Sequence, residues 1–421
     1  MDLKNIVAKA LQNKQSISFI LINIAVAFLG FTRSFVFIEF LNLEELGLIT
    51  LVQTGAMFVG FFQIGLINGG YRIIALQKTH LSEKTNNVIF SYFGVLFVFL
   101  MLVYFTDFFV DFFDKKLIIL LTLLIGLSLL VVNWLTNVLI ASRNLVLLNR
   151  VNLISSVLSV LSLPLAFYLG IYGAAFVILI QPAVFIILIL VISKTLRPSE
   201  FILNITEIKK ILHYGFIPFI SGIFFLLYVQ IERWSINLFL GTTALGSLYL
   251  FFLITALWVL VPTSIMNLFY PRGVAFYEEK KIFQFKRIIQ FHFYTVIIYS
   301  AILILGLIMF LGPLVEYVFP QHTPYVKFVL YAIPGFVFRS LRDPISTFLN
   351  SVVKLKPMLY SDIASLSMYC AYIYTLWIFD KCSVVNFVIG FNIYFILKFI
   401  TVYIPYKKLN SNLTNINDEI N

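Results

Sequence analysis

The sequence predicts an all-α polytopic membrane protein of about twelve transmembrane helices in two six-helix repeats. Of its 421 residues, 61% are apolar and only 12% are charged, and the mean hydropathy is +0.99. A soluble protein of this size could not bury so much apolar surface. Apolar runs of about 18 residues or more, each long enough to cross the hydrocarbon core as a helix, recur along the whole chain. A pattern of arginines that the two halves share indicates the repeat.

The apolar runs define the predicted spans. Helices are expected because membrane β-strands would be shorter and would alternate apolar with polar residues. The twelve spans are predicted at residues 17–41, 47–71, 88–106, 117–141, 151–169, 173–193, 214–240, 246–270, 291–311, 326–350, 358–379 and 384–405. The connectors are short, and the two longest are expected at 194–213 and 271–290, on the same side of the membrane.

The same pattern divides the chain into five parts. No cleavable signal peptide is expected, because the basic amphipathic start reads as a short helix that lies on the membrane. The polar, Asn-rich end of the chain is expected to be disordered. The parts are a cytoplasmic amphipathic segment at 1–15, an N-terminal six-helix lobe at 16–193, a cytoplasmic linker at 194–213, a C-terminal six-helix lobe at 214–405 and a cytoplasmic tail at 406–421.

Lysines and arginines in the connectors predict the orientation. One side carries 21 of the 30 basic residues and the other side carries four, so the richer side is expected to be cytoplasmic, with both termini. Most of the net charge of +11 is then a topology signal and an attraction to anionic lipid, and nucleic acid is not expected as a partner. The other five basic residues fall inside predicted spans: Arg33, Arg233, Arg339, Arg342 and Lys398.

The two halves align on arginines. Arg33 aligns with Arg233, and Arg72 aligns with Arg272, at a spacing of 39 residues in each half. A Leu-Gly pair in the outer turn after the first arginine aligns within one residue. Six spans separate the copies, and this even number predicts parallel repeats related by an axis along the membrane normal, a symmetry found in transporters.

Several motifs give the chain a family resemblance. They are the first outer turn LNLEELG, the basic end of the second span NGGYRIIA and the entry to the seventh span YGFIPFISG. With two six-span halves, the chain resembles the polysaccharide-biosynthesis flippases, which move lipid-linked O-antigen or capsule units across the bacterial cytoplasmic membrane. This family belongs to the multidrug/oligosaccharidyl-lipid/polysaccharide exporter superfamily, together with lipid II flippases and multidrug extruders. The resemblance covers about residues 15–405.

The resemblance implies a fold, a cargo and a location. The fold would be a V-shaped bundle like that of the multidrug and toxin extruders, with a central cavity lined by the first, second, seventh and eighth spans. The cargo would be a polyprenyl-diphosphate oligosaccharide, carried by alternating access in the bacterial inner membrane. Membrane lipid, a glycan polymerase and a chain-length regulator would be its partners.

Arginines in the spans are the first candidate site residues. A charged side chain inside a span costs about 2.5–3.5 kcal/mol and usually faces protein or water. Arg33 and Arg233 are therefore predicted to face the cavity and to hold the diphosphate, which a guanidinium matches in a bidentate manner. The alternative is that both side chains reach the outer headgroups. Arg72 and Arg272 are predicted either to capture the diphosphate at the cytoplasmic mouth or to serve as interfacial anchors.

The motif FRSLRDP in the tenth span offers a second candidate site. Arg339 and Asp343 stand one helical turn apart and are expected to form a structural pair, with Arg342 between them. A proton- or ion-sensitive carboxylate at Asp343 beside a hinge at Pro344 is the alternative. Lys398 is expected to be a cytoplasmic anchor.

Uncharged polar residues in four spans complete the predicted cavity face. Their amides suit hydrated sugar rings, but they could equally bond between helices. The candidates for substrate binding are Asn23, Gln53, Asn68, Gln230 and Asn267.

Enzyme signatures are missing from the sequence. There is no GxxxxGK[ST] loop, no HExxH pattern and no cysteine framework, so neither a cofactor nor a metal is expected. A membrane glycan polymerase or ligase is one alternative, but such enzymes usually carry a larger outer loop. A multidrug cation extruder is the other, and it would need acidic groups in the first-half cavity.

Overall fold

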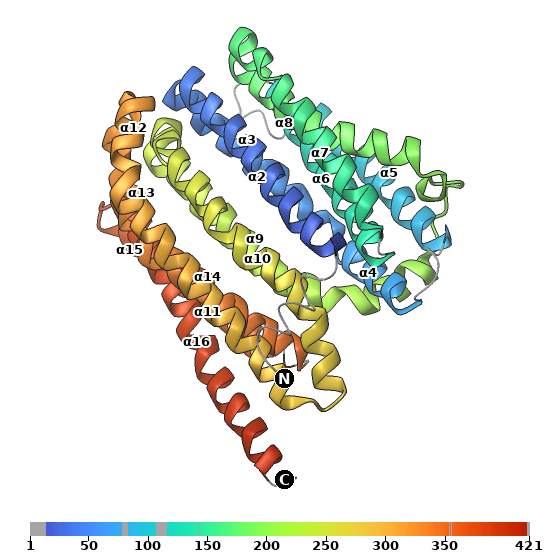
Figure 1. Ribbon diagram of the computed structural model, residues 1–421. Helices are drawn as coiled ribbons and strands as arrows, with labels where there is room; N and C mark the ends of the chain where they lie inside the picture. The colour runs from blue at the N-terminus through green and yellow to red at the C-terminus, as the bar shows by residue number, and fades with distance from the viewer. Residues whose placement is uncertain are drawn as a thin grey trace. The chain divides into compact units, whose positions relative to one another are not determined.

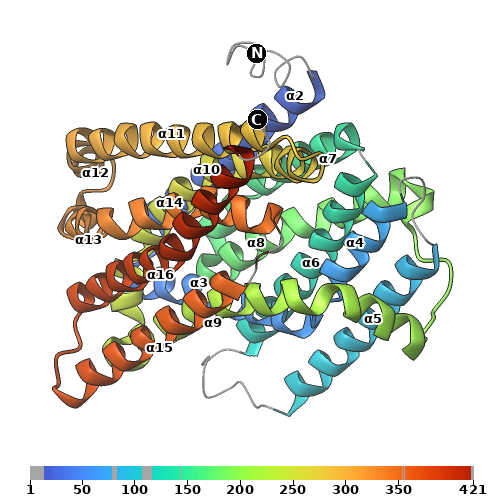
Figure 2. The ribbon, with the colours of Figure 1, turned by 90° about the horizontal axis from the view of Figure 1, so that it is seen from below.

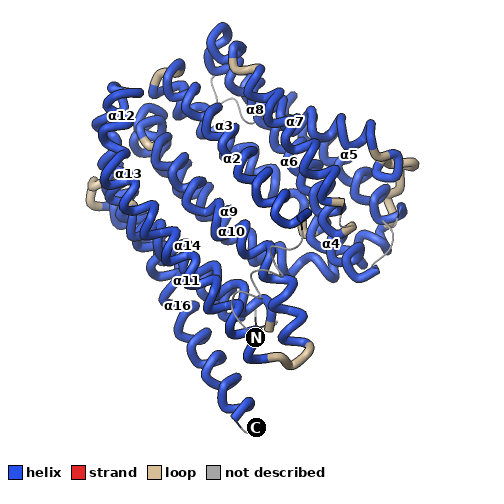
Figure 3. The backbone as a smooth tube through the Cα atoms, in the orientation of Figure 1, coloured by secondary structure: helices blue, strands red, loops and turns tan. Residues whose placement is uncertain are grey.

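The computed structural model describes a protein built from helices and short connections (Figure 1). The structure describes residues 14–77, 83–106, 116–142, 144–352, 354 and 356–418, and the side chains at 14–20, 75–77, 217–218, 221, 267–268, 271 and 412–418 lie outside the description. None of the described residues forms a strand (Figure 3). Most of the amphipathic segment predicted at 1–15 lies outside the described residues.

The multi-span character of the chain is confirmed. Nine helices among the described residues are long and apolar enough to cross a membrane. Helix α7 (Leu145–Leu161) has only 17 residues, but the first residues of the next helix extend its apolar run. Helices α14 (Ile333–Ser351) and α15 (Lys356–Ile378) are long enough but carry charged and hydroxyl groups. Together these helices account for between nine and twelve spans.

The described residues form two compact units, 1–233 and 234–421. In the first unit, α6 makes contacts with α3, α4, α5, α7 and α8, and α2 packs on α7 (Figure 1). Besides α7, the helices of this unit are α2 (Lys14–Phe40), α3 (Leu43–Val59), η1 (Gly60–Gln63), α4 (Leu66–Gln77), α5 (Glu83–Phe105), α6 (Lys116–Ala141), α8 (Pro164–Ile192) and η3 (Lys194–Leu196). Helix α9 (Ile205–Ser247) begins in this unit and crosses the boundary.

The second predicted span is broken rather than continuous. Helix α3 ends in the short turn η1, and Ile64 and Gly65 then take positive φ angles of 44° and 96° before α4 begins. A Cβ on Gly65 would lie 2.8 Å from the carbonyl oxygen of Gly215 in α9, and one on Gly215 would lie 1.9 Å from that of Gly65. The backbones of α4 and α9 therefore meet at a distance that only glycine allows.

The connector predicted at 194–213 is shorter in the structure and is fixed to α5. Helix α9 already begins at Ile205. Asn87 donates to the hydroxyl of Ser199 (2.9 Å) and accepts from its backbone N–H (3.1 Å), and the N–H of Ile202 donates to Ser91 (2.8 Å). These bonds, with the glycine contact, place the linker and the first part of α9 in the first unit.

In the second unit, α14 is the central helix. It lies between α11 and α16 and also makes contacts with α10 (Figure 2). Besides α14 and α15, the unit contains α10 (Tyr249–Glu278), α11 (Ile282–Gly306), η4 (Leu307–Leu311), α12 (Gly312–Val318), η5 (Pro320–Tyr325), α13 (Val326–Tyr331) and α16 (Val384–Asp418). The connector predicted at 271–290 is largely helical, since α10 and α11 extend beyond their apolar runs and leave three residues between them.

The expectation of a disordered C-terminal tail is also wrong. Helix α16 continues beyond residue 405 to Asp418. Tyr406 and Leu409 pack against a buried cluster that contains Phe285 and Phe348, and Lys286 donates to the carbonyl oxygen of Asn410 (3.0 Å). These contacts hold the first part of the tail, up to Asn410, against the rest of the second unit.

Candidate functional site

Arg33 projects from α2 toward α7 and α8 in the first unit. Its Nη1 donates to Oε1 of Gln181 in α8 at 3.0 Å and to Oγ of Ser159 in α7 at 3.4 Å. The side chain is half-buried. An amide oxygen and a hydroxyl orient the guanidinium without contributing a negative charge.

The groups around Arg33 form a chain of hydrogen bonds. Gln181 donates through Nε2 to Oγ of Ser156 (3.1 Å), and Ser159 donates to the carbonyl oxygen of Val177 (2.9 Å). Ser156 and Ser159 are 3% and 1% exposed, so the chain lies inside the packed helices. We refer to Arg33, Ser156, Ser159 and Gln181 as the amide–arginine cluster.

Two of the other predicted residues meet on α3. Gln230 donates to the carbonyl oxygen of Thr54 (2.9 Å), and Nη1 of Arg233 donates to the hydroxyl of the same residue (3.1 Å). The hydroxyl of Thr54 in turn donates to the carbonyl oxygen of Thr50 (2.6 Å). The two arginines that the sequence aligns thus bond to different helices: Arg33 to side chains of α7 and α8, and Arg233 to α3.

Arg72 lies in the middle of α4 and is exposed. Its guanidinium carbon is 5.8 Å from the centroid of the Tyr214 ring in α9, a cation–π distance. Arg272, which the sequence aligns with it, is half-buried in α10. Arg72 of α4 and Tyr214 of α9 therefore place a cation and an aromatic ring beside each other, and the cation is within reach of solvent.

The side chains that bond to Arg33 are Gln181 and Ser159, which are not among the polar residues predicted for substrate binding on α2, α3 and α4. Asn23, Gln53 and Asn68 are each half-buried. Asn267 belongs to α10, but its side chain lies outside the described part of the structure. Their contact with a substrate stays a prediction.

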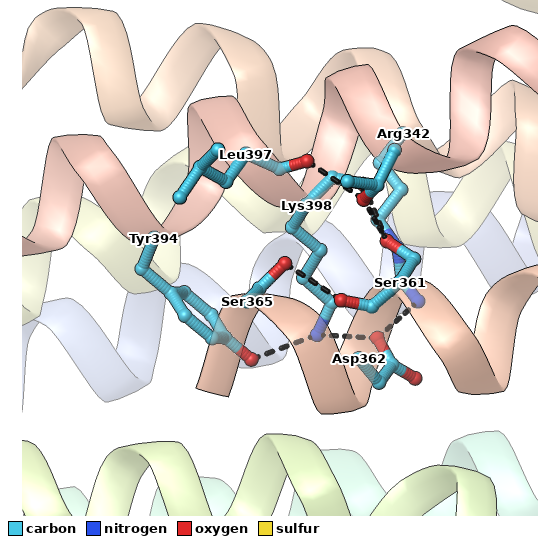
Figure 4. A network of polar contacts seen from close by, with 8 residues as sticks. Arg342, Ser361, Asp362, Ser365, Tyr394, Leu397 and Lys398 are labelled. Carbon is cyan, nitrogen blue, oxygen red and sulfur yellow. Dashed lines mark hydrogen bonds and ion pairs between the residues drawn. The ribbon is translucent and has the colours of Figure 1, made fainter. Parts of the chain in front are cut away.

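A second cluster of charges lies between α14, α15 and α16 (Figure 4). Oδ1 of Asp362 lies 2.8 Å from Nη2 of Arg342 and 3.0 Å from Nζ of Lys398. Lys398 also donates to the hydroxyl of Tyr394 (2.9 Å). The side chains of Asp362 and Lys398 are 2% and 1% exposed, so both charges are removed from solvent. We refer to Arg342, Asp362 and Lys398 as the carboxylate-bridged cluster.

This arrangement changes two expectations. Lys398 is not a cytoplasmic anchor, because α16 packs on α15 and the ammonium meets Asp362 inside the unit. In the FRSLRDP motif, Arg342 pairs with Asp362 outside the motif, and Arg339 lies over the ring of Phe395 at 5.3 Å. Asp343 lies in the electrostatic field of Arg342, Arg339 and Lys398.

Sequence reasoning missed Gln181, Ser159 and Asp362. Gln181 stands before a proline in a long apolar run, and an amide in that place is a usable signal. Asp362 is the acidic residue of a helix rich in serine and tyrosine, and nothing in the local pattern links it to a lysine 36 residues later. Among the described residues, no group of three or more His, Cys, Asp or Glu side chains could hold a metal ion.

Comparison with known proteins places the fold. No protein-family model and no curated protein sequence matches the chain. It is similar to an inward-facing multidrug resistance MATE family transporter of the MOP superfamily, with a TM-score of 0.68 and 14% identity over 96% of this chain and 99% of that one. It is also similar to the lipid II flippase MurJ in an inward closed conformation, with a TM-score of 0.67 and 13% identity over 93% and 87% of the two chains.

A third similar structure is a MOP superfamily transporter from Pyrococcus furiosus, described as having a binding pocket of reverse polarity that suggests a different function. Its TM-score is 0.64, with 15% identity over 95% of each chain. At these identities the similarity establishes the fold alone. The chain is a multi-pass membrane protein with the fold of the MOP superfamily transporters, as the resemblance predicted.

Proposed function

We propose that the protein is a flippase that moves a polyprenyl-diphosphate oligosaccharide from the cytoplasmic to the outer leaflet of a bacterial inner membrane by alternating access. The cargo would be an O-antigen or capsule repeat unit. The fold supports a transporter, and the surroundings of Arg33 support an anionic cargo.

The amide–arginine cluster is the observation that carries the proposal. A guanidinium inside a span is costly, so it is retained where it has a use. Arg33 is held by neutral oxygens of Gln181 and Ser159, which fix its direction and add no charge of their own. A positive charge that is oriented in this way suits an anion, and guanidinium geometry suits phosphate oxygens in particular.

Other residues take supporting parts in the proposal. Arg72 with Tyr214, and Arg272 in the second unit, would attract the diphosphate at the cytoplasmic side. Arg233 would serve as a second cation for the cargo, while Asn23, Gln53, Asn68, Gln230 and Asn267 would bond to sugar hydroxyls. Moving two negative charges out of a cell with a negative interior is favoured by roughly 4–5 kcal/mol per 100 mV, so the membrane potential could drive export without ATP.

A transport assay tests the proposal. The purified protein is reconstituted into liposomes with a fluorescent polyprenyl-diphosphate sugar, and the rate of leaflet exchange is compared for wild type, Arg33→Ala and Arg33→Lys. We expect a loss of about tenfold or more in the alanine variant, from loss of charged hydrogen bonds. The lysine variant should keep part of the rate because it keeps the charge but not the fork.

The exposed Arg150 of α7 provides a matched control, since Arg150→Ala removes the same side chain outside the cluster. Undiminished exchange in both Arg33 variants, with normal expression, would remove Arg33 from the mechanism. Transport of a cationic dye in place of the lipid-linked sugar would favour a multidrug extruder.

A further inference from the structure

Helices α4 and α9 make backbone contact at two levels in the first unit. A Cβ on Gly65 would lie 2.8 Å from the carbonyl oxygen of Gly215, and a Cβ on Gly69 would lie 1.9 Å from that of Ile211. Real Cβ atoms cannot approach so closely, so a side chain at either glycine would push the two helices apart. The spacing of α4 and the first part of α9 is therefore fixed by glycine.

The contact between Arg72 and Tyr214 stands on this junction. Tyr214 directly precedes Gly215 in α9, and Arg72 follows Gly69 by three residues, nearly one helical turn, in α4. The guanidinium carbon lies 5.8 Å from the centroid of the tyrosine ring. The ring and the cation are thus carried by two backbones whose separation the glycines set.

The tyrosine ring can hold the guanidinium without neutralising it. The face of an aromatic ring attracts a cation but carries no formal charge. Arg72 is exposed, whereas Tyr214 is half-buried, so the ring has the more restricted surroundings. An exposed arginine loses rotamer freedom when it binds a ligand, and a contact that already limits its motion lowers this cost.

We propose that Tyr214 is a positioning residue for the capture of the diphosphate, because its ring holds the guanidinium of Arg72 in place before the substrate arrives. The inference rests on the proposed function, in which Arg72 attracts the diphosphate at the cytoplasmic side. It goes further by assigning a separate role to a residue of α9, which acts on the substrate through Arg72.

Transport at several substrate densities tests the inference. The liposome assay with a fluorescent polyprenyl-diphosphate sugar gives the half-saturating density and the maximal rate for wild type, Arg72→Ala, Tyr214→Leu and Tyr214→Phe. The half-saturating density should rise about tenfold or more in Arg72→Ala, the size of a charged hydrogen bond. It should rise about two- to fivefold in Tyr214→Leu, the size of an exposed cation–π contact, and stay near wild type in Tyr214→Phe, which keeps the ring. Neither tyrosine variant should change the maximal rate, because the ring acts on capture.

The double variant Arg72→Ala with Tyr214→Leu separates positioning from packing. If the ring acts through Arg72, its removal has no further effect once the arginine is gone, and the double variant should match Arg72→Ala. A ring that only packs α9 would add the same factor in both backgrounds, and that result would overturn the inference. Tyr168→Leu is the matched control, since Tyr168 is 78% exposed on α8 and lies outside the junction of α4 with α9.

The outcomes separate the two proposals. If wild type does not exchange the lipid-linked sugar, the proposed function fails and the inference fails with it. If wild type exchanges it and Arg72→Ala raises the half-saturating density but Tyr214→Leu does not, the proposed function survives and the role of Tyr214 is refuted. An unchanged Arg72→Ala would likewise overturn the inference while transport itself stands. Should Tyr214→Leu fail to fold, Tyr214→Gln takes its place, with the same expected rise and the same contradicting result.

Discussion

The two units hold a membrane-embedded cation in opposite ways. In the first unit, Arg33 is bonded to the amide of Gln181 and the hydroxyl of Ser159. In the second unit, Lys398 and Arg342 share one oxygen of Asp362. In the first arrangement, hydrogen bonds orient the guanidinium of Arg33. In the second, a carboxylate joins two cations. Basic side chains placed in predicted spans are therefore held by different kinds of partner in the two units.

The difference teaches how to read charge inside a membrane protein. Removing one partner of a buried ion pair strongly destabilises the fold, because the other charge is left buried without compensation. A cation held by neutral dipoles depends less on any one of them, since each contributes a single hydrogen bond. The carboxylate-bridged cluster is therefore expected to control stability, and the amide–arginine cluster is expected to control binding.

The largest effect on stability is expected for Asp362→Asn. This change leaves Lys398 and Arg342 facing each other without the carboxylate, which should lower the free energy of unfolding by about 3–5 kcal/mol. Thermal unfolding of the protein in detergent measures it. Asp380→Asn is the matched control, because Asp380 is exposed after α15 and tolerates the change. Equal melting temperatures for both variants would mean that the bridge does not stabilise the unit.

Lys398→Met should have a smaller effect. Arg342 remains 2.8 Å from Asp362, so the carboxylate keeps a partner when the ammonium is lost. We expect a loss of about 1.5–3 kcal/mol, which is the usual range for a hydrogen bond to a charged group. The same melting experiment applies. A loss as large as that of Asp362→Asn would show that the lysine, rather than the arginine, is the main partner of the carboxylate.

Ser159→Ala should lower the free energy of unfolding still less. The serine is one of two recorded partners of Nη1 on Arg33, at the longer distance of 3.4 Å, and both partners are neutral. The expected loss is about 1 kcal/mol in unfolding free energy. If this variant destabilises the protein as much as Lys398→Met does, the contrast between the two clusters is not one of charge.

The smallest effect on stability is expected for the exposed ion pair of Lys84 with Glu207. Their atoms are 2.8 Å apart, and the hydrogen bond from Lys84 holds the pKa of Glu207 below its ordinary value. A depressed pKa stabilises the fold above the unfolded-state pKa, and this stability is lost as the pH falls through the folded-state pKa. Glu207→Gln should cost less than about 1 kcal/mol near neutral pH, and should flatten the acid limb of a melting-temperature profile. An unchanged acid limb would contradict this.

The sequence predicted most of the fold, because apolar length alone identifies membrane helices. It could not predict the break at Ile64 and Gly65, since a glycine in an apolar run does not reveal that α9 passes against it. It also placed the ends of α10 and α16 too early and the start of α11 too late. Helices α10 and α16 continue past the apolar runs, where scattered apolar side chains such as Tyr277, Tyr406 and Leu409 pack against a buried cluster.

The candidate sites were predicted in part. The scarcity of charge in the spans identified Arg33, Arg233 and Arg342 without any structure. Their partners could not be predicted, because Gln181 and Asp362 stand 148 and 20 residues away from Arg33 and Arg342 and are brought near by helix packing. The alignment of Arg33 with Arg233 likewise does not predict their partners, which lie on α7 and α8 for Arg33 and on α3 for Arg233.

The most direct test compares the loss of a cation from each cluster. The dissociation constant of inorganic pyrophosphate is measured for Arg33→Gln and for Lys398→Met, with wild type as reference. The account predicts a rise of about tenfold or more for the first variant and less than about threefold for the second. An unchanged affinity in Arg33→Gln, or an equal loss in both variants, would contradict it.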